Sequence, residues 1–234
     1  MSCDFARAEE PAYKPWLETW AGADASAQVW LIYSGATIAP FGNVWSDGWR
    51  LRISGGYGQY DVTHGKTRYA ARTTTTDLVA GYQMRFGNLT AKLFAGASHI
   101  GLEAVAKDGS RHISEPEIGF KSALELWLDI GDHAFASFDA AGTTAHASFS
   151  TRVRYGYRIT PPLSLGPELV LNGNDTWAGS DRNVLGRALH GDSRIGGFAR
   201  FQWTGGEISA SGGISGDISQ PSRPYATITL SLQF

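Results

Sequence analysis

The sequence predicts an all-β protein, a single antiparallel up-and-down transmembrane β-barrel of about twelve strands. The composition favours extended chain with tight turns, because the 234 residues include 29 glycines, 12% aromatic residues and only 18% charged residues. Apolar and polar residues alternate in many segments, most clearly in residues 225–234 (YATITLSLQF), which end on an aromatic residue. The closing strand of an outer-membrane barrel has this pattern, because lipid touches one face and the lumen touches the other.

The period of two recurs in twelve segments, of which the first is the weakest, so ten strands remain an alternative. An even number returns both chain ends to the periplasm, as single-chain bacterial barrels require. Residues 9–234 form the predicted barrel. Residues 1–8 contain Ala6-Arg7-Ala8, which has the form of a cleavage site, and are either a signal-peptide remnant or a disordered amino-terminus. The strands are expected near residues 16–23, 27–38, 47–60, 68–85, 89–105, 114–130, 134–141, 145–159, 163–173, 187–203, 207–216 and 224–234.

Within several strands the alternation separates charged from apolar side chains. The strand near 47–60 places Arg50 and Arg52 opposite Leu51, and the strand near 114–130 places Lys121 and Glu125 on one face. A soluble barrel would hold its apolar face inside, so alternation alone does not decide which face is inner.

The lengths of the connections favour a membrane barrel, because such barrels have short periplasmic turns and longer extracellular loops. We therefore expect the charged faces to line the lumen. Short connections are predicted at residues 86–88, 131–132, 160–162 and 204–206, with a somewhat longer one at 40–48, and they alternate with longer or more polar ones near 61–67, 106–114, 140–145, 172–191 and 216–224.

The strand register tests this assignment. A tight hairpin over residues 160–163 would place Arg154 opposite Glu168 on the lumen side, where the two should form an ion pair. We predict a lumen charge network that either fills the bore or lines a hydrated path for polyanions or sugars; charges of both signs favour the filled bore. Its members are Arg50, Arg52, Lys121, Glu125, Arg152, Arg154, Arg158, Glu168 and Arg200.

Charge and cysteine content argue against several other classes. The formal net charge is -2, with 20 Lys and Arg against 22 Asp and Glu, so no basic excess indicates nucleic-acid binding. The single Cys3 excludes an intramolecular disulfide, and no Cys and His cluster has zinc-ligand spacing, so we expect no metal and no cofactor. The longest apolar runs, such as residues 29–33, are far shorter than the roughly 18 residues of a membrane helix.

An ordered set of segments spans nearly the whole chain. It comprises GADAS at 22–26, a run from Tyr33 through Ala39-Pro40 into SDGWRLRISGGYGQY at 46–60, ALELWLDI at 123–130, the strand with Arg152, Arg154 and Gly156-Tyr157-Arg158, LGPE at 165–168 and the closing strand. In this order the segments resemble the cellulose biosynthesis protein BcsS family of alphaproteobacteria. The resemblance implies an outer-membrane protein encoded with cellulose synthase components, with no established enzymatic activity and no catalytic residues to transfer.

The expected function is therefore a non-enzymatic accessory role in bacterial cellulose biosynthesis, aiding export or surface attachment of cellulose from the outer membrane. Expected partners are outer-membrane lipid and either cellulose or cellulose synthase components. A small porin-like diffusion channel is the first alternative, and a lipid A-modifying barrel enzyme is the second.

The sequence His146-Ala147-Ser148 is the strongest hint of catalysis. It is similar to the His and Ser pair that an outer-membrane lipid A deacylase carries two residues apart on one strand, with a carboxylate near. In such an enzyme the pair faces lipid, whereas alternation places Ser148 on the side of Arg152 and Arg154. We therefore expect no enzymatic activity.

Aromatic residues and one loop are the candidates for glycan contact. Most tryptophans, among them Trp20, Trp30, Trp45, Trp49 and Trp203, are expected to be interfacial girdle residues near strand ends, whereas Trp127 shares a face with Lys121 and Glu125. The longest outer loop, residues 172–191, is either a glycan or partner contact surface or an ordinary solvated loop. Its candidate contact residues are Asp175, Trp177, Asp181, Arg182 and Arg187.

Overall fold

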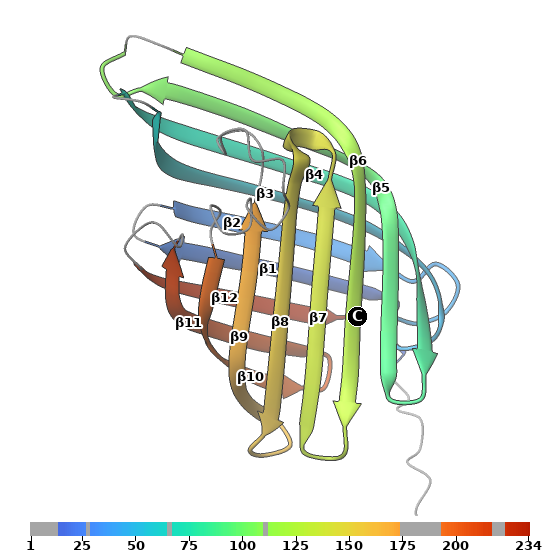
Figure 1. Cartoon of the computed structure of the whole chain (residues 1–234). Helices are drawn as coiled ribbons and strands as arrows, with labels where there is room; N and C mark the ends of the chain where they lie inside the picture. The colour runs from blue at the N-terminus through green and yellow to red at the C-terminus, as the bar shows by residue number, and fades with distance from the viewer. Residues whose placement is uncertain (1–13, 27–28, 65–66, 110–111, 174–192, 217–222) are drawn as a thin grey trace, which may run out of the picture.

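Twelve antiparallel strands form one closed barrel in the computed structural model, which describes residues 14–26, 29–64, 67–109, 112–173, 193–216 and 223–234. Each strand pairs with its neighbours in chain order, and β12 closes the barrel against β1 (Figure 1). The predicted fold class is therefore confirmed, while the expectations for residues 1–8 lie outside the described residues. The strands are β1 (Leu17–Ser26), β2 (Val29–Ile38), β3 (Gly48–His64), β4 (Thr67–Phe86), β5 (Leu89–Ala106), β6 (His112–Ile130), β7 (Ala134–Thr143), β8 (Ser148–Arg158), β9 (Leu163–Gly173), β10 (Ser193–Trp203), β11 (Gly206–Gly216) and β12 (Arg223–Gln233).

The apolar residues of the alternating strands face outward. Ile118 is 76% exposed and Leu78 is 64% exposed, whereas Glu168 is 3% exposed. This is the reverse of a soluble barrel and matches a wall whose outer surface meets hydrocarbon. The predicted choice of inner and outer faces is confirmed.

The start of β1 and the end of β12 lie together at one end of the barrel, which we call the terminal end. The backbone amides of Trp16 and Leu17 donate to the carbonyl oxygen of Phe234 at 2.6 and 3.0 Å. Tight turns join strands at the same end, and Gly131 and Gly205 adopt the positive φ angles of 59° and 88° that such turns need. The opposite end is called the far end below.

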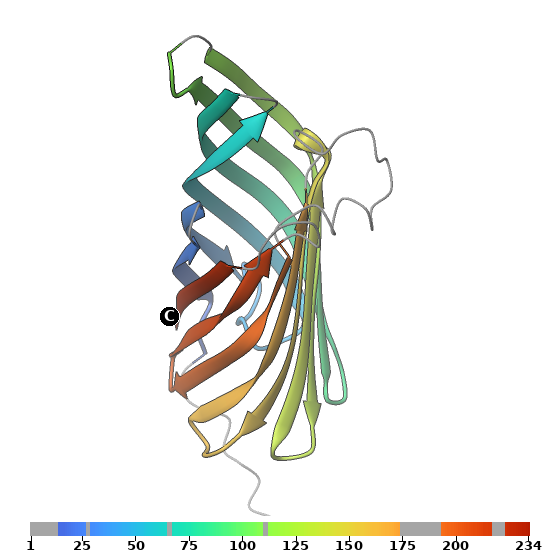
Figure 2. The same cartoon turned by 60° about the vertical axis from the view of Figure 1, so that its left-hand side comes forward.

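Four consecutive strands are much longer than the rest and rise beyond the other strands at the far end (Figures 1 and 2). Strands β3 to β6 have 17, 20, 18 and 19 residues, whereas the others have 10 or 11. We call their outer parts, residues 57–64, 67–74, 101–106 and 112–116, the extension. Parts of the predicted longer connections near 61–67, 106–114 and 140–145 are strand in the structure, namely residues 61–64, 67, 106, 112–114 and 140–143.

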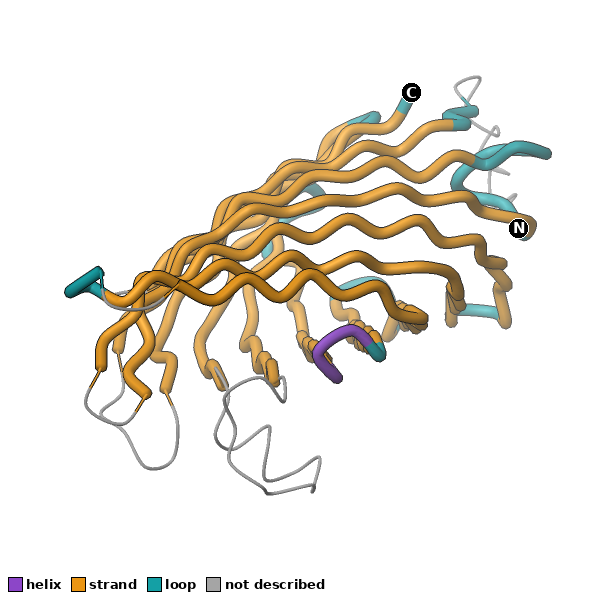
Figure 3. Tube along the Cα trace, turned by 90° about the horizontal axis from the view of Figure 1, so that it is seen from above, coloured by secondary structure: helices purple, strands orange, loops and turns teal. Residues whose placement is uncertain are grey.

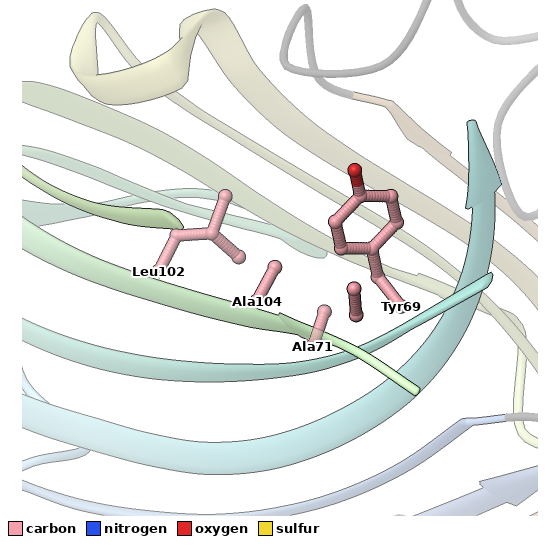
Figure 4. Packing of buried hydrophobic residues seen from close by; sticks show 5 residues of the cluster. Tyr69, Ala71, Leu102 and Ala104 are labelled. Carbon is pink, nitrogen blue, oxygen red and sulfur yellow. The ribbon is translucent and has the colours of Figure 1, made fainter. Parts of the chain in front are cut away.

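The inner face of the extension has a small apolar cluster of its own. Tyr69 and Ala71 of β4 lie beside Leu102 and Ala104 of β5, and their side chains point to the same side of the sheet (Figure 4). Each is less than 5% exposed, and Tyr60 of β3 packs against them. This apolar packing differs from the charged interior closer to the terminal end and gives the extension an apolar inner layer.

The outer part of β6 has no strand neighbour on its β7 side among the described residues. Strand β7 pairs with β6 only from Lys121 onward, and the 3₁₀ turn η1 (Ala145–Ala147) packs against β6 just beyond that point (Figure 3). The amide of Phe120 donates to Thr144 Oγ1 at 2.9 Å, so alternate residues from Phe120 outward direct their backbone to the open edge. Pro116 holds one of those positions and offers no N–H there.

The strands β8 and β9 approach very closely at Gly166. The Cα pairing of these strands is interrupted between Arg154↔Glu168 and Tyr157↔Leu165, where Pro167 lacks a donor. A Cβ atom on Gly166 would lie 1.8 Å from the carbonyl oxygen of Tyr155, which is backbone and cannot rotate away.

We expect Gly166→Ala to lower the free energy of unfolding by about 1–3 kcal/mol, because the two backbones must separate. Urea unfolding of the refolded protein in detergent micelles measures the change. Gly142→Ala on β7 is the matched control, since its Cβ would have its nearest neighbour at 3.9 Å. Equal stability of the two variants would contradict the prediction.

Candidate functional site

Inward side chains of both charges surround a cavity of about 550 Å³ in the barrel lumen. Six predicted network members line it: Arg52, Lys121, Glu125, Arg152, Arg154 and Arg200. The structure adds five charged lining residues that the predicted network omits: Glu18, Asp77, Lys92, Asp139 and Glu207. The lining therefore mixes cations and anions rather than presenting one sign of charge.

The ion pair expected between β8 and β9 is present. Arg154 lies opposite Glu168 in the strand register, and its Nη2 atom is 2.5 Å from Glu168 Oε2. Arg152 shares the same carboxylate, with Nε at 3.8 Å, and the Tyr225 hydroxyl donates to Glu168 Oε1 at 3.2 Å. The buried Glu168 of β9 thus contacts two arginines of β8 and a tyrosine of β12, a strand that is not its neighbour in the wall.

A second group bridges the lumen near the terminal end. Both terminal nitrogens of Arg52 on β3 bond the two carboxylate oxygens of Glu125 on β6, with Nη2 at 3.2 Å from Oε2. Lys92 of β5 lies 3.7 Å from Glu125 and 4.0 Å from Glu18 of β1. Strands that are not neighbours in the wall are therefore joined by charge.

A third group lies deeper along the same wall. Lys121 Nζ is 2.5 Å from Asp77 Oδ2, and the hydroxyls of Ser54 and Ser98 donate to the same carboxylate at 3.1 and 2.6 Å. These contacts join β3, β4, β5 and β6. The Asp77 carboxylate has a partner for both of its oxygens, which suits a site with little water.

Arginines and aromatic rings from β6, β7, β8 and β10 form a further group in the lumen, in the half of the barrel nearer the terminal end. Trp127 of β6 stacks on Phe135 of β7 with ring centroids 4.2 Å apart. The guanidinium of Arg200 on β10 lies 4.5 Å from the Trp127 ring centroid and also pairs with Glu207 on β11. Arg158 lies 5.4 Å from the Phe135 centroid and pairs with Asp129. Such cation and ring contacts are strongest where water is excluded.

Arg50 lies apart from the charge network, although the sequence places it on the inner face. It is 2% exposed, and its guanidinium donates to the carbonyl oxygens of Trp49, Asn43, Val44 and Ser46, the first two at 2.8 and 3.1 Å. Inward residues of two other strands also hold this turn, residues 39–47: the Gln83 amide donates to the Ser46 carbonyl, and Trp45 Nε1 donates to Gln233 Oε1, both at 3.0 Å. Arg50 thus fastens the turn against the terminal mouth of the lumen.

We expect Arg50→Ala to lower the free energy of unfolding by about 3 kcal/mol, because several buried carbonyls lose a charged donor. The turn should also become sensitive to proteolysis between residues 39 and 47. Limited proteolysis with mass spectrometry and urea unfolding measure both effects. Arg85→Ala, an exposed arginine at the same end, should change neither, and an equal response of the two variants would contradict the prediction.

The tryptophans divide between the outer surface and the interior. Trp30, Trp49 and Trp203 lie on the outside, as expected of girdle residues. The girdle interpretation is wrong for Trp20, which lines the lumen with the Arg52 guanidinium 5.1 Å from its ring centroid. The β1 register causes this, because it places Trp20 opposite Gly35, whose missing side chain leaves room for the ring. Trp127 faces the lumen, as its shared face with Glu125 predicts.

The His146-Ala147-Ser148 sequence is not a continuous strand. His146 and Ala147 have φ angles of 49° and 41°, so the strand begins at Ser148 instead of the predicted residue 145. His146 Nδ1 lies 3.4 Å from Glu117 Oε2, and the His146 amide donates to the same oxygen at 2.8 Å. The carboxylate therefore orders the turn next to the open edge of β6. The loop candidates Asp175, Trp177, Asp181, Arg182 and Arg187 lie outside the described residues.

Some pairs that sequence reasoning missed lie in strands with weak alternation. Arg194 of β10 pairs with Asp24 of β1, which also accepts a hydrogen bond from Thr227 at 2.9 Å. The inner face of β1 carries Glu18, Gly22 and Asp24 together with the apolar Trp20. This mixture weakens the alternation of apolar and polar residues in β1. The strong alternation of β12 could have indicated the inner residues of β1, because pairing the two strands places Asp24 opposite Thr227 on the polar face of β12.

Two kinds of element are absent from the part of the chain that the structure describes. It has no group of three or more His, Cys, Asp and Glu side chains that could hold a metal ion. None of its helices is both long enough and apolar enough to cross a membrane.

The closed barrel, with its apolar outer surface and charged lumen, is an outer-membrane β-barrel. In such proteins the short turns face the periplasm. The terminal end, which carries the short turns, is therefore periplasmic, and the extension is extracellular. The chain belongs to the cellulose biosynthesis protein BcsS family, whose profile matches residues 19–234. The resemblance predicted from the ordered segments is confirmed, and the family indicates a role in cellulose biosynthesis. Comparison with curated proteins gives no match.

Solved structures share the barrel fold with little sequence identity. The KdgM porin in complex with disordered oligogalacturonate has a TM-score of 0.50 at 7% identity, over 93% of this chain and 99% of that one. The translocator domain of autotransporter NalP from Neisseria meningitidis has a TM-score of 0.51 at 12% identity, over 93% and 87%. The transport unit of the autotransporter AIDA-I from Escherichia coli has a TM-score of 0.51 at 10% identity, over 100% and 94%. At these identities the likeness concerns the fold alone.

Proposed function

We propose that this protein is a non-enzymatic accessory of cellulose biosynthesis that attaches cellulose at the cell surface and does not pass it through its lumen. The observation that carries the proposal is the set of side chains that cross the periplasmic half of the lumen. Arg52 and Glu125 join β3 to β6, and Arg200 of β10 reaches Trp127 of β6. A polymer would have to break these contacts to pass.

Breaking the contacts would be costly. Separating a buried or half-buried ion pair leaves desolvated charges without partners, which costs several kcal/mol for each pair. The turn over residues 39–47, fastened by Arg50, adds backbone at the periplasmic mouth. Twelve strands are too few to leave a wide channel once large side chains point inward.

The extension supports action at the extracellular side. Four strands continue beyond the shorter strands of the barrel, and an apolar cluster around Ala71 and Ala104 packs on their inner face. A sheet of this size is more than a barrel needs to close its wall. It offers surface for a polymer or a partner outside the cell.

Deletion of the gene, with complementation by the full chain, tests the proposal. We expect total cellulose to be unchanged and the share retained with the cells, compared with the share shed into the medium, to fall. Complementation by a variant lacking the cross-lumen residues Arg52 and Arg200 should restore retention. A fall in total cellulose with polymer accumulating inside the envelope would instead indicate a role in export.

A small diffusion channel is the second candidate, favoured by the cavity of about 550 Å³ and its hydrophilic lining. In that case solutes much smaller than a glucan chain would cross the lumen. Conductance measurements separate the two candidates and are described in the Discussion.

A further inference from the structure

The outer surface of the extension contains a groove of about 370 Å³, separate from the lumen. Tyr57 of β3, Thr74 and Arg72 of β4, Gly101 and Glu103 of β5 and Ser114 of β6 line it. None of these residues belongs to the predicted lumen network.

The groove lies on the extracellular side of the apolar surface. Outward positions along β4 are apolar from Phe86 to Leu78 and become polar at Thr76, Thr74 and Arg72. The corresponding change on β5 comes after Ala97, at His99 and Glu103. Because the lipid-facing band of such barrels is only about 25 Å tall, the groove faces water just above it.

Two cross-strand rows build the groove. Tyr57, Thr74 and Gly101 lie opposite one another in the register, and Gln59, Arg72 and Glu103 form the next outward-facing row. Gly101 makes the floor, because a Cβ there would lie 2.6 Å from Thr74 Oγ1. Neighbouring strands are about 4.8 Å apart, so the rows from β3 to β6 span about 14 Å, the scale of a short oligosaccharide.

An aromatic pair forms one end of the groove. Tyr57 is 36% exposed, and its ring centroid lies 5.6 Å from that of Trp30 on β2, with 60° between the ring planes. The contact restricts the tyrosine ring while leaving part of it open. A tyrosine ring that is already restricted by a neighbouring ring loses little conformational entropy when a ligand stacks on it.

The charged residues of the groove balance each other without pairing. Arg72 and Glu103 are directly opposite and exposed, yet no ion pair within 4.0 Å joins them or ties either to another described residue. Both heads are therefore free to bond a ligand. The glutamate beside the arginine disfavours an anion such as a phosphate, so the groove fits a neutral ligand with many hydroxyl groups.

We propose that this groove binds a short stretch of a neutral β-linked glucan. An apolar face of a sugar ring stacks on Tyr57, and the ring hydroxyls bond the Arg72 guanidinium, the Glu103 carboxylate and the Thr74 hydroxyl. Sites for small ligands commonly combine an aromatic wall with a few placed polar groups in this way. The proposal rests on the proposed surface-attachment function and assigns that function to particular residues.

Binding of cellohexaose to the full chain in detergent micelles, measured by calorimetry, tests the proposal, with maltohexaose for comparison. Tyr57→Ala and Arg72→Ala should each weaken cellohexaose binding by about tenfold, the loss expected for one stacking or charged contact. Tyr57→Phe should bind like the wild type. Tyr82→Ala is the matched control, because Tyr82 forms a similar outward pair with Trp49 at the periplasmic end, with centroids 5.5 Å apart.

Several results would overturn the assignment. Absence of cellohexaose binding by the folded wild type, or wild-type affinity for cellohexaose in Tyr57→Ala or in Arg72→Ala, would each do so. Heat-modifiable migration verifies folding of every variant. If cells need the protein for cellulose retention but Tyr57→Ala restores it fully, only the groove assignment fails. If gene deletion leaves retention unchanged, the surface-attachment function itself fails.

Discussion

Glu168→Ala is expected to lower the free energy of unfolding by about 3–5 kcal/mol, the range for removing one partner of a buried ion pair. Glu168 is almost fully buried and is the shared anion of Arg152 and Arg154. Without it two neighbouring guanidinium groups repel each other where little water can screen them. Urea titration of the refolded protein, followed by tryptophan fluorescence, measures the loss.

Two further variants show whether burial causes the effect. Glu207→Ala removes the partner of Arg200 at a carboxylate that is one-third exposed, so its cost should be about 1 kcal/mol. The double variant Arg154→Met, Glu168→Leu should recover part of the loss from Glu168→Ala, because apolar side chains need no partner. A Glu168→Ala variant as stable as Glu207→Ala would show that water reaches this part of the lumen freely.

Single-channel recordings in planar bilayers should detect little or no conductance for the wild type and clear channel steps for the double variant Arg52→Ala, Arg200→Ala. Arg52 reaches Glu125 and Arg200 reaches Trp127 across the lumen, so the double variant removes both cross-lumen contacts at once. The expected increase is severalfold, since ions would then cross the periplasmic half through water.

Arg72→Ala provides the control for conductance, because it removes the same kind of side chain from the outer surface of the extension. It should leave the recordings unchanged. A wild type with stable, large conductance would contradict the filled lumen and support the diffusion channel. A silent double variant that migrates as a folded barrel would mean that the turn fastened by Arg50 closes the pore without these arginines.

The inner and outer faces and part of the lumen could be predicted because they follow from local pattern. A period of two assigns every residue of a strand once one face is known, and a tight hairpin after Ile159 fixes which residue lies opposite Arg154. The partner Glu168 follows from these two facts alone. Contacts between non-neighbouring strands, such as that of Arg52 with Glu125, need the curvature of the closed wall, which no single strand encodes.

Other features escape sequence reasoning for different reasons. Only the outermost parts of the extension, residues 61–64, 67, 106 and 112–113, fall outside the predicted strands, because polar residues such as Asp61, His64 and His112 interrupt the alternation there. Arg50 alternates like a lumen residue, but the fold of the turn over residues 39–47 decides that its partners are backbone carbonyls. The groove depends on Gly101 and Tyr57 being opposite across two strand pairings, which only the full register reveals.

The proline on the open edge of β6 bears on whether a second copy of the protein can add a strand there. Bare strand edges invite a second copy to continue the sheet, and crowded surface proteins with such edges tend to polymerise. At Pro116 an added strand would find the proline ring in place of a backbone N–H donor. The η1 turn, whose His146 amide donates to Glu117, covers the neighbouring stretch of the edge. Edge-to-edge pairing of two copies through this stretch of β6 is therefore disfavoured.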